Sequence, residues 1–429
     1  MYNTNMRYLL VTDGTWGDVL PFMYIALEMQ KRGHNVVVLS NEHYKIFAED
    51  NGIPFEITTT DEDRSKFLSN QDLWDPNKGM SVVATFTGLM FFKTFKVLEE
   101  KVLEHKKLNE KFDMIISHSF SYAAKTISEI NRIPHCSVLI SPIQLKSNYR
   151  LPVFYGGKDY NFIPQILKSI IYPMVNKFIL DPLFPKEINA FRKIKGLKPI
   201  RSFVFWNTKS DLTIGLWPNW YAPLEIDQLS GSKLAGFTKD VEMLRITSDE
   251  KLDQWIKNGE KPIIVTMGSG YFFNHEILQT FKEITEISKE RFIIVGPNNE
   301  DLNFSNSSKI FCANQLPFSQ ILPRCKLAIH HGGAGTLAQV IQAGIPHLVV
   351  PQSHDQPDNA YRIYKNNLGL IIWNQRPTPP EIIEKINLIF SSDKYTKLCA
   401  ETKDKVINDT NGIIKACDLI ENFNKLGHD

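Results

Sequence analysis

Two stretches of the sequence concentrate residues that could do chemistry. The first, His330–Gln356, reads HHGGAGTLAQVIQAGIPHLVVPQSHDQ. Glycines at the start of a helix let a ligand approach the backbone, and the free N–H groups and positive dipole end of that helix attract a phosphate. The stretch therefore predicts a phosphate site at Gly333, Gly335 and Thr336. It matches neither GxxxxGK[ST] nor GxGxxG, which argues against a P-loop or a dinucleotide fold.

The histidines and the Asp-Gln pair of this stretch suggest distinct roles. His330 and His331 are neighbours at a strand end, so they point to opposite faces and cannot chelate one metal ion together. We expect one to be structural and His331 to donate to a phosphate oxygen. Asp355 and Gln356 follow the next strand pattern, where open α/β folds bind ligands, and they suit sugar hydroxyls. The alternative for Asp355 is the N-cap of the next helix.

The second stretch, GTWGDVLP, contains Asp18 between a glycine turn and a helix. A later strand pattern, DMIIS, ends in His118. A positioned carboxylate or imidazole can deprotonate an attacking hydroxyl, which accelerates such reactions about 10²–10⁴-fold. The structural alternatives are an N-cap role for Asp18 and a satisfied strand-end role for His118.

Alternating strand and helix patterns would position these residues. The first half contains the apolar runs RYLLVT, NVVVLS, FEIT, DMIISH and HCSVLI, and the second half contains PIIVTMGSG, RFIIVG, KIFCA, KLAIHH, HLVVP and LGLIIW, with helical patterns between them. Near-continuous apolar strands separated by helices imply parallel sheets covered on both faces. We therefore expect an α/β protein of two doubly wound, Rossmann-like domains.

The expected domain boundaries follow from a change in composition between the halves. The tract 216–237 is irregular and rich in aromatic residues and proline, which favours a linker. We expect an N-terminal domain at 1–225, a linker at 226–240 and a C-terminal domain at 241–400. A C-terminal helix at 401–429 could cross back to the first domain.

Composition excludes several classes. The chain has 49 Lys and Arg against 47 Asp and Glu, which argues against a nucleic-acid partner. Its five cysteines show no metal spacing and no secretory signal is visible, so we expect reduced thiols, no metal and a cytoplasmic location. The apolar stretches 81–92 and 161–184 are too short or too interrupted to span a bilayer. A transient membrane contact is a further hypothesis, because four lysines flank them: Lys93, Lys96, Lys168 and Lys177.

These motifs carry a resemblance to a known family. The segment 314–363, NQLPFSQILPRCKLAIHHGGAGTLAQVIQAGIPHLVVPQSHDQPDNAYRI, resembles the nucleotide-sugar signature of the GT-B glycosyltransferases of family 1. The opening GTWGDVLPFMYIALEMQKRGHNVVVLS is similar to that of the branch with sterol glucosyltransferases, rhamnosyltransferases and antibiotic glycosyltransferases. The resemblance implies a GT-B fold with two domains facing a cleft, an acceptor in the first and a nucleotide sugar in the second.

The resemblance also implies residue roles. The glycine loop, His331 and Thr336 would hold the diphosphate, the backbone of Leu316 would meet the base, and Asp355 with Gln356 would hold the sugar. Gln315 and Gln339 stand where plant members have a stacking Trp and a ribose-binding Glu, which leaves UDP or dTDP open. The residues expected to bind the nucleotide sugar are Thr15, Ser269, Gln315, Leu316, His331, Gly333, Gly335, Thr336, Gln339, Asp355 and Gln356.

The activity that the resemblance implies is an inverting, metal-independent hexosyltransferase without a bound cofactor. The expected donor is a UDP-sugar, UDP-glucose before a dTDP-sugar, and the expected acceptor is an apolar hydroxylated molecule. Asp18 would be the base and His118 secondary, or His118 the base with Asp18 orienting it. The alternatives are a nucleotide-sugar epimerase on the same fold and a non-catalytic accessory protein for a partner transferase.

Overall fold

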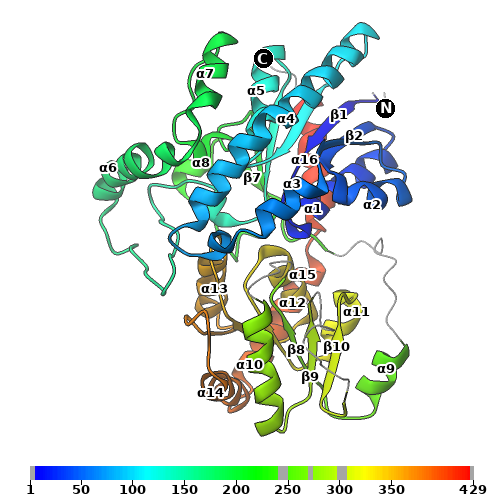
Figure 1. Cartoon of the computed structure of the whole chain (residues 1–429), viewed down its shortest axis with the longest axis vertical. Helices are drawn as coiled ribbons and strands as arrows, with labels where there is room; N and C mark the ends of the chain where they lie inside the picture. Colours follow the sequence, from blue (N-terminus) through cyan, green and yellow to red (C-terminus); the bar gives the residue numbers. More distant parts are fainter. Residues whose placement is uncertain (1–4, 240–249, 269–273, 297–306, 426–429) are drawn as a thin grey trace.

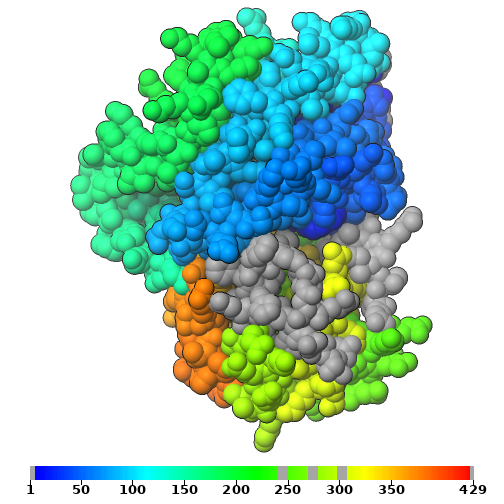
Figure 2. Space-filling view, in the orientation of Figure 1, coloured from blue at the N-terminus to red at the C-terminus, as the bar shows by residue number. Residues whose placement is uncertain are grey.

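The computed structural model contains two α/β units, one above the other in Figure 1. It describes residues 5–239, 250–268, 274–296 and 307–425. Each unit is built on a single parallel sheet, of seven strands in the first unit and six in the second. The expected fold class is therefore confirmed. Figure 2 shows the first unit, coloured blue to green, resting on the second.

Seven short strands form the first sheet, and most of their side chains are buried. They are β1 Arg7–Val11, β2 Asn35–Asn41, β3 Phe55–Thr59, β4 Met114–His118, β5 His135–Leu139, β6 Leu212–Gly215 and β7 Ser232–Leu234. Their order is β3-β2-β1-β4-β5-β6-β7, so the chain winds outward from β1 and then restarts at β4 beside it. The β1/β4 junction is a topological switch point, where such sheets bind ligands beyond the carboxyl ends of the strands.

Helices cover both faces of the first sheet. They are α1 Trp16–Lys31, α2 Lys45–Asp50, α3 Asp61–Leu68, α4 Gly79–Lys107, α5 Tyr122–Asn131, α6 Gln165–Val175, α7 Lys186–Ile194 and α8 Phe203–Trp206, with short turns η1 Glu42–Tyr44, η2 Gln71–Trp74, η3 Pro142–Gln144, η4 Asn176–Leu180, η5 Asp181–Leu183 and η6 Ile226–Gln228. One buried cluster joins α1, α2 and the last helix of the chain to one face. A second joins α4, α5, α7 and α8 to the other.

The second sheet repeats this plan. Its strands are β8 Ile263–Thr266, β9 Phe292–Val295, β10 Ile310–Ala313, β11 Leu327–His330, β12 His347–Val349 and β13 Gly369–Ile371. Their order, β10-β9-β8-β11-β12-β13, sets a switch point between β8 and β11. The glycine-rich stretch follows β11, so it starts at that switch point.

Helices also cover both faces of the second sheet. They are α9 Glu250–Lys257, α10 Asn274–Ile287, α11 Phe318–Ile321, α12 Ala334–Ala343, α13 Gln356–Lys365, α14 Pro379–Phe390 and α15 Lys394–Asn408, with η8 Leu322–Arg324 after α11. The last helix, α16 Gly412–Lys425, packs on the first sheet instead. Apolar side chains of α10 and α14 pack on one face of the sheet. Those of α9, α12, α13 and α15 pack on the other.

The segment expected to link the units belongs to their cores. Trp217 and Tyr221 are buried in one cluster with Leu337 and Ala360 of the second unit. Strand β7 pairs in parallel with β6, so the first sheet extends to residue 234. Strand β7 falls within the linker that we expected at 226–240. A three-residue strand, SKL, is too short for its hydrophobic pattern to be recognised.

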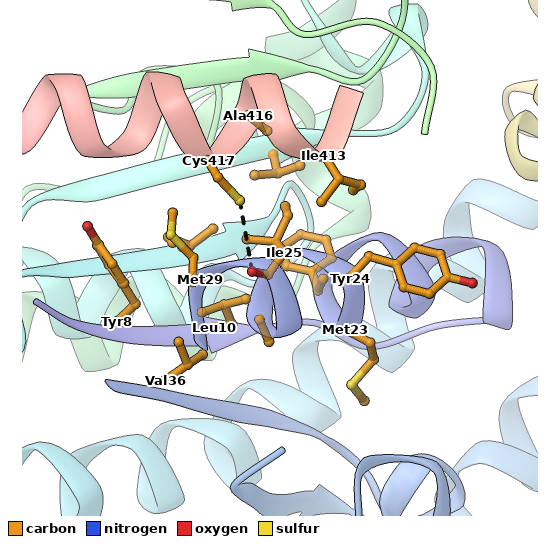
Figure 3. Close-up of a cluster of buried hydrophobic side chains, with 14 of the residues drawn as sticks. Tyr8, Leu10, Met23, Tyr24, Ile25, Met29, Val36, Ile413, Ala416 and Cys417 are labelled. Atoms are coloured by element: carbon orange, nitrogen blue, oxygen red, sulfur yellow. Dashed lines mark hydrogen bonds between the residues drawn. The ribbon is translucent and has the colours of Figure 1, made fainter. Parts of the chain in front are cut away.

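The last helix returns to the first unit. In Figure 3, Ile413, Ala416 and Cys417 of α16 face Ile25 and Met29 of the first unit. The Cys417 thiol lies 3.9 Å from the carbonyl oxygen of Ile25. The preceding helix, α15, packs against α12 of the second unit. The two final helices therefore fasten one unit to the other.

Helix α4 is longer than its apolar run suggested. It has 29 residues and mean hydropathy 1.3 over its most apolar window, and by length and composition it could cross a membrane. Its Phe91, Phe95 and Leu98 are buried in the core on one face of the first sheet. In this structure α4 covers the sheet.

The contact between α16 and α1 should carry measurable stability. Ile420 is fully buried on α16, whereas Ile414 on the same helix is 40% exposed. We expect Ile420→Ala to lower the free energy of unfolding by about 2–4 kcal/mol, since it leaves a cavity. Ile414→Ala, the control, should change it by less than about 0.5 kcal/mol. Urea denaturation measures both, and equal effects would contradict the packing of α16.

Candidate active site

The carboxyl ends of the two sheets face each other across a cavity of about 630 Å³. Its lining comes from the loops after β1 and β4 and from α4 in the first unit, and from the loops after β8, β11 and β12 in the second. The volume falls within the range of about 300–1,000 Å³ that small-molecule sites occupy. Both switch points therefore open into one space.

Two helix N-termini converge in this space. Helix α1 begins after its N-cap Thr15, and α12 begins after its N-cap Gly333. A Cβ atom added to Gly335 would lie 3.8 Å from the Cα atom of Gly17, so the first turns of the helices are in near contact. Each turn has free N–H groups and the positive end of a helix dipole. The junction of the two units is thus suited to an anion.

The glycine-rich loop is shaped around the ring of His331. A Cβ at Gly268 would lie 2.6 Å from Cε1 of that ring, and one at Gly333 would lie 2.3 Å from its Nε2. Gly268 also has φ +73°, a conformation that side chains rarely adopt. Burial lowers the pKa of His331 to about 4, so the ring is neutral at pH 7. A neutral imidazole still has one N–H to donate.

His330 is the structural member of the histidine pair. It is fully buried, and its Nε2 lies 2.9 Å from Nδ1 of His347. The backbone N–H of Gly332 donates to its Nδ1 at 3.1 Å. Burial lowers the pKa of His330 well below its usual value. This neutral ring therefore holds the glycine loop to β12.

Asp355 and Gln356 line the cavity beside the glycine loop, where α13 begins. Asp355 occupies the N-cap position, but its side chain makes no capping bond. It accepts a hydrogen bond from Asn359 Nδ2 at 2.8 Å. Burial, followed by the charge of Asp18, raises the pKa of Asp355 to about 7. Asp355 therefore occupies the N-cap position that we considered as the alternative, but its side chain does not cap the helix.

The oxygen of the Gln356 side chain is used within its own loop. Oε1 accepts from the backbone N–H of Gln352 at 2.8 Å and of Ser353 at 3.4 Å. Gln356 is 4% exposed and lines the cavity. Any contact between Gln356 and a ligand would therefore fall to its amide nitrogen.

Asn359 supports the site from behind the cavity wall, and the sequence did not reveal it. Its Nδ2 donates to the carbonyl oxygen of Gly332 at 2.9 Å as well as to Asp355. Its Oδ1 accepts from Ser141 and Tyr221 of the first unit, at 3.2 and 3.3 Å. One amide thus ties the glycine loop, the acidic residue and the other unit together. The sequence feature that could have revealed Asn359 is its position four residues after Asp355, which places both residues on the same helix face.

His354 is a second residue that sequence reasoning missed. Its backbone adopts φ +59°, and its ring lines the cavity. The Nε2 atom lies 2.8 Å from the carbonyl oxygen of Leu73 in the first unit. The loop before α13 therefore meets η2 across the cleft.

Asp18 both completes the N-terminus of α1 and lines the cavity. One oxygen, Oδ2, accepts from the backbone N–H of Thr15 at 2.8 Å and from its hydroxyl at 2.9 Å. The other, Oδ1, lies 3.6 Å from Nε2 of His118. Gly14 has φ +123°, and a Cβ there would lie 2.6 Å from Oδ2. Thr15 is the N-cap of α1. Asp18, for which we considered that role as the alternative, is the third residue of the helix.

The two candidate bases differ in accessibility. The His118 side chain is 5% exposed and that of Asp18 is 24% exposed. Burial lowers the pKa of His118, against the opposing charge of Asp18. The N–H of Phe120 donates to Nδ1 of His118 at 3.4 Å, and the Gln144 amide lies 3.4 Å from Nε2. Both groups line the cavity, and the carboxylate is the more exposed of the two.

The predicted site residues divide into those that do not line the cavity, one that lies outside the described residues, and those that line the cavity. Gln315 is exposed and Leu316 packs beside a buried cluster, and neither lines the cavity, which Phe318 reaches instead. Ser269 lies outside the described residues. In the described part of the chain, no group of three or more His, Cys, Asp or Glu is arranged to hold a metal ion. The predicted residues that line the cavity are Thr15, Asp18, His118, His331, Gly333, Gly335, Thr336, Gln339, Asp355 and Gln356.

Comparison with known families gives a match in each unit. Residues 8–143 match the glycosyltransferase family 28 N-terminal domain. Residues 279–417 match the C-terminal domain of erythromycin biosynthesis protein CIII-like proteins. The two matches fall on the two sheets and include the loops that carry Asp18 and His331.

Individual relatives match nearly the whole chain. Sterol 3-beta-glucosyltransferase of Arabidopsis thaliana is 25% identical over 97% of this chain, which spans 65% of the relative's length. The enzyme of that name from Saccharomyces cerevisiae is 22% identical over 96% of the chain, which spans 34% of that relative. O-mycaminosyltylonolide 6-deoxyallosyltransferase of Streptomyces fradiae is 23% identical over 97% of both chains.

Solved structures agree on the fold. The glycosyltransferase of kitacinnamycin has TM-score 0.73 at 16% identity, with 98% of this chain and 99% of the other covered. Spinosyn rhamnosyltransferase, complexed with thymidine diphosphate, has TM-score 0.65 at 12% identity, with 97% of this chain and all of the other covered. The chain therefore has the GT-B fold, and its family matches and relatives are glycosyltransferases or their domains.

We expect Gly335→Ala to weaken ligand binding without lowering the stability of the fold. The nearest atom to the added methyl is 3.8 Å away, an ordinary contact, and alanine favours a helix by about 1 kcal/mol over glycine. We expect Tm to stay level or rise. The methyl would occupy the space between the helix starts, so Kd for UDP-glucose should rise at least about tenfold by calorimetry. Unchanged affinity would place the diphosphate elsewhere.

Proposed function

We propose that this chain is an inverting hexosyltransferase that moves a sugar from a UDP-sugar, UDP-glucose above all, to a hydroxyl of an apolar acceptor. The observation that carries the proposal is the cavity of about 630 Å³ that both units line. One part of it is suited to an anion and a sugar, another part is apolar, and Asp18 lies between them. Transfer between two substrates requires such a joint site.

The donor end combines several features that favour a diphosphate. The N-termini of α1 and α12 meet there, and the ring of His331 is neutral beside them. These groups would stabilise the negative charge that a departing diphosphate gains, which supports a reaction without a metal ion. The thymidine diphosphate bound to the rhamnosyltransferase neighbour supports a nucleotide at this end and leaves UDP and dTDP to be compared directly.

The reaction would proceed in one displacement. Asp18 Oδ1 takes the proton of the acceptor hydroxyl as that oxygen attacks the anomeric carbon of the sugar. The bond from that carbon to the diphosphate oxygen breaks, and its electron pair leaves with the nucleotide. Attack from the side opposite the diphosphate inverts the anomeric centre. His118, buried and 3.6 Å away, would position the carboxylate.

The acceptor end supports an apolar substrate. The apolar segments 85–95 and 162–180, which we expect from the family resemblance to form acceptor walls, contribute cavity-lining side chains from α4 and from α6 with η4. Helix α4 is also part of the core of the sheet, because Phe95 and Leu98 are buried there. The lining residues from these two walls are Phe86, Thr87, Met90, Phe91, Thr94, Tyr172, Val175 and Leu180.

Two rival functions predict a different site. An epimerase acts on the nucleotide sugar alone and gives no reason for an apolar wall in the first unit. An accessory protein has no need for a base at the junction, whereas Asp18 is present and accessible. A cytoplasmic location is part of our proposal, because the donor that we infer is a nucleotide sugar.

Product analysis tests the proposal. The protein is incubated with UDP-glucose and a panel of hydroxylated apolar acceptors, including sterols, terpenoids and polyphenols. We expect a β-glycoside of at least one acceptor and release of UDP. Conversion of the donor without an acceptor would indicate an epimerase. Activity confined to small polar sugars would overturn the acceptor class, and no product at all would favour the accessory protein.

Asp18→Asn tests the base. Asparagine keeps one side-chain oxygen for Thr15, so we expect a loss of folding stability below about 1 kcal/mol. The expected loss in kcat at saturating donor is about 10²–10⁴-fold, because the proton acceptor is removed. His118→Ala, the comparison variant, should lose less, since that ring only positions Asp18. If Asp18→Asn keeps more than about a tenth of kcat, Asp18 is not the base.

The raised pKa of Asp355 predicts a pH dependence of donor binding. Above about pH 7 the carboxylate is ionised and accepts bonds from sugar hydroxyls. Below that pH it is protonated, so Kd for UDP-glucose should rise by up to about tenfold per pH unit between pH 7 and 5.5. Asp355→Asn should bind weakly, with Kd nearly constant from pH 5.5 to about 8.5. A wild-type Kd that is flat over this range would contradict a sugar contact by Asp355.

A further inference from the structure

Helix α6 exposes most of its apolar side chains and buries its lysine. Ile166, Ile170 and Met174 are 75%, 55% and 53% exposed. On the opposite face, Lys168 is 5% exposed and Asn176, just after the helix, is 1% exposed. A surface helix of a protein in water has the reverse arrangement, with its apolar stripe against the core. This helix is therefore suited to an apolar neighbour on its outer side.

The inward position of Lys168 is fixed by hydrogen bonds. Its ammonium group donates to the backbone oxygens of Tyr149 and Asn161, at 2.9 and 3.1 Å. Rotation of α6 to bury its isoleucines would break these bonds and expose Tyr172, which packs beside Phe205. The outward apolar face thus follows from the packing of the helix.

The exposed apolar residues continue beyond the helix. We call them the α6 surface: Phe162, Ile166, Leu167, Ile170, Ile171, Met174, Phe178 and Ile179, each at least 45% exposed. In Figure 1, α6 lies at the outer edge of the first unit, away from the second sheet. A patch of this kind on the described part of a chain marks an interaction site.

Positive charge accompanies this patch. Residues 158–201 contain nine Lys and Arg against three Asp and Glu, whereas the whole chain has a net charge of only +2. Two of the nine, Lys168 and Arg192, are buried, but Lys177 lies exposed within the patch, and Lys186 and Lys193 are exposed farther along the chain. An apolar face accompanied by exposed lysines is typical of helices that lie in the interface of an anionic bilayer. A second copy of this chain would bring the same positive charge to the contact and repel it.

We propose that the α6 surface binds an anionic lipid bilayer, with α6 lying in the interface. The inner face of this segment continues into the cavity, because Tyr172, Val175 and Leu180 line it. A bound bilayer would therefore lie directly outside the apolar wall of the cavity. Bilayer binding is a property of the surface and goes beyond the proposed transfer, although an acceptor dissolved in lipid would be delivered to that wall.

The test is co-sedimentation of the full chain with vesicles, without a nucleotide sugar. The vesicles are phosphatidylcholine alone or with about one third phosphatidylglycerol. The test variant is Ile166→Asp with Ile170→Asp, at sites 75% and 55% exposed. The control is Ile46→Asp with Ile407→Asp, at helical sites 72% and 55% exposed. Neither pair lines the cavity.

We expect wild type and control to bind the anionic vesicles within about twofold of each other, and the test variant to bind at least about tenfold more weakly. Binding to phosphatidylcholine alone, or in about 0.5 M salt, should be weaker. A second test variant, Lys177→Glu with Lys186→Glu, changes only exposed side chains and should also bind anionic vesicles more weakly. It still tests the proposal if the isoleucine variant does not fold.

Three results would overturn the proposal. One is absence of wild-type binding to anionic vesicles. Another is equal binding by wild type and both test variants. The third is a wild-type dimer in sedimentation that dissociates in the test variant, because a second copy would then cover the surface. UDP binding by calorimetry is measured on the same samples, so failure of the bilayer proposal is distinguished from failure of the transferase proposal.

Discussion

The near contact of two helix starts from separate sheets is the constraint on which the site depends. The first turns of α1 and α12 approach each other across the junction, where a Cβ added to Gly335 would lie 3.8 Å from the Cα atom of Gly17. The N-termini of both helices direct partial positive charge into the same cavity. In a cavity these like charges are screened less well than in open water. Such an arrangement is unfavourable until an anion occupies it. The shared core around Trp217 and the return of α16 to α1 supply the packing that holds the units in this position.

Two acidic residues beside this positive centre each take part in more than one interaction. Asp18 satisfies the first turn of α1 with one oxygen and presents the other to the cavity. Asp355 lies beside the glycine loop, and burial together with the charge of Asp18 raises its pKa to about 7. Asn359 links Asp355 to the glycine loop and to the first unit.

Sequence patterns predicted most of the fold because its strands are buried on both faces. Runs such as KLAIHH and DMIISH are unambiguous, and the residues that follow them, His331 and the loop after His118, fall at the expected switch points. The three-residue β7 has no such signal. The sequence also indicated which residues lie beside the glycine loop. It could not reveal Asn359, whose partners Ser141 and Tyr221 reach it only through the fold, nor which side of α6 faces inward, because that depends on Lys168. Gln315 and Leu316 were placed by family position alone, and the described cavity does not reach them.

Calorimetric titration of the wild-type chain with UDP, dTDP, GDP and uridine tests the central claim most directly. The account assigns the anchoring of the donor to two helix starts that bind a diphosphate. It predicts that UDP or dTDP binds, and that uridine, which lacks the diphosphate, binds at least about 100-fold more weakly. Equal affinity for uridine and UDP, or no binding of any of the three diphosphates, would contradict it.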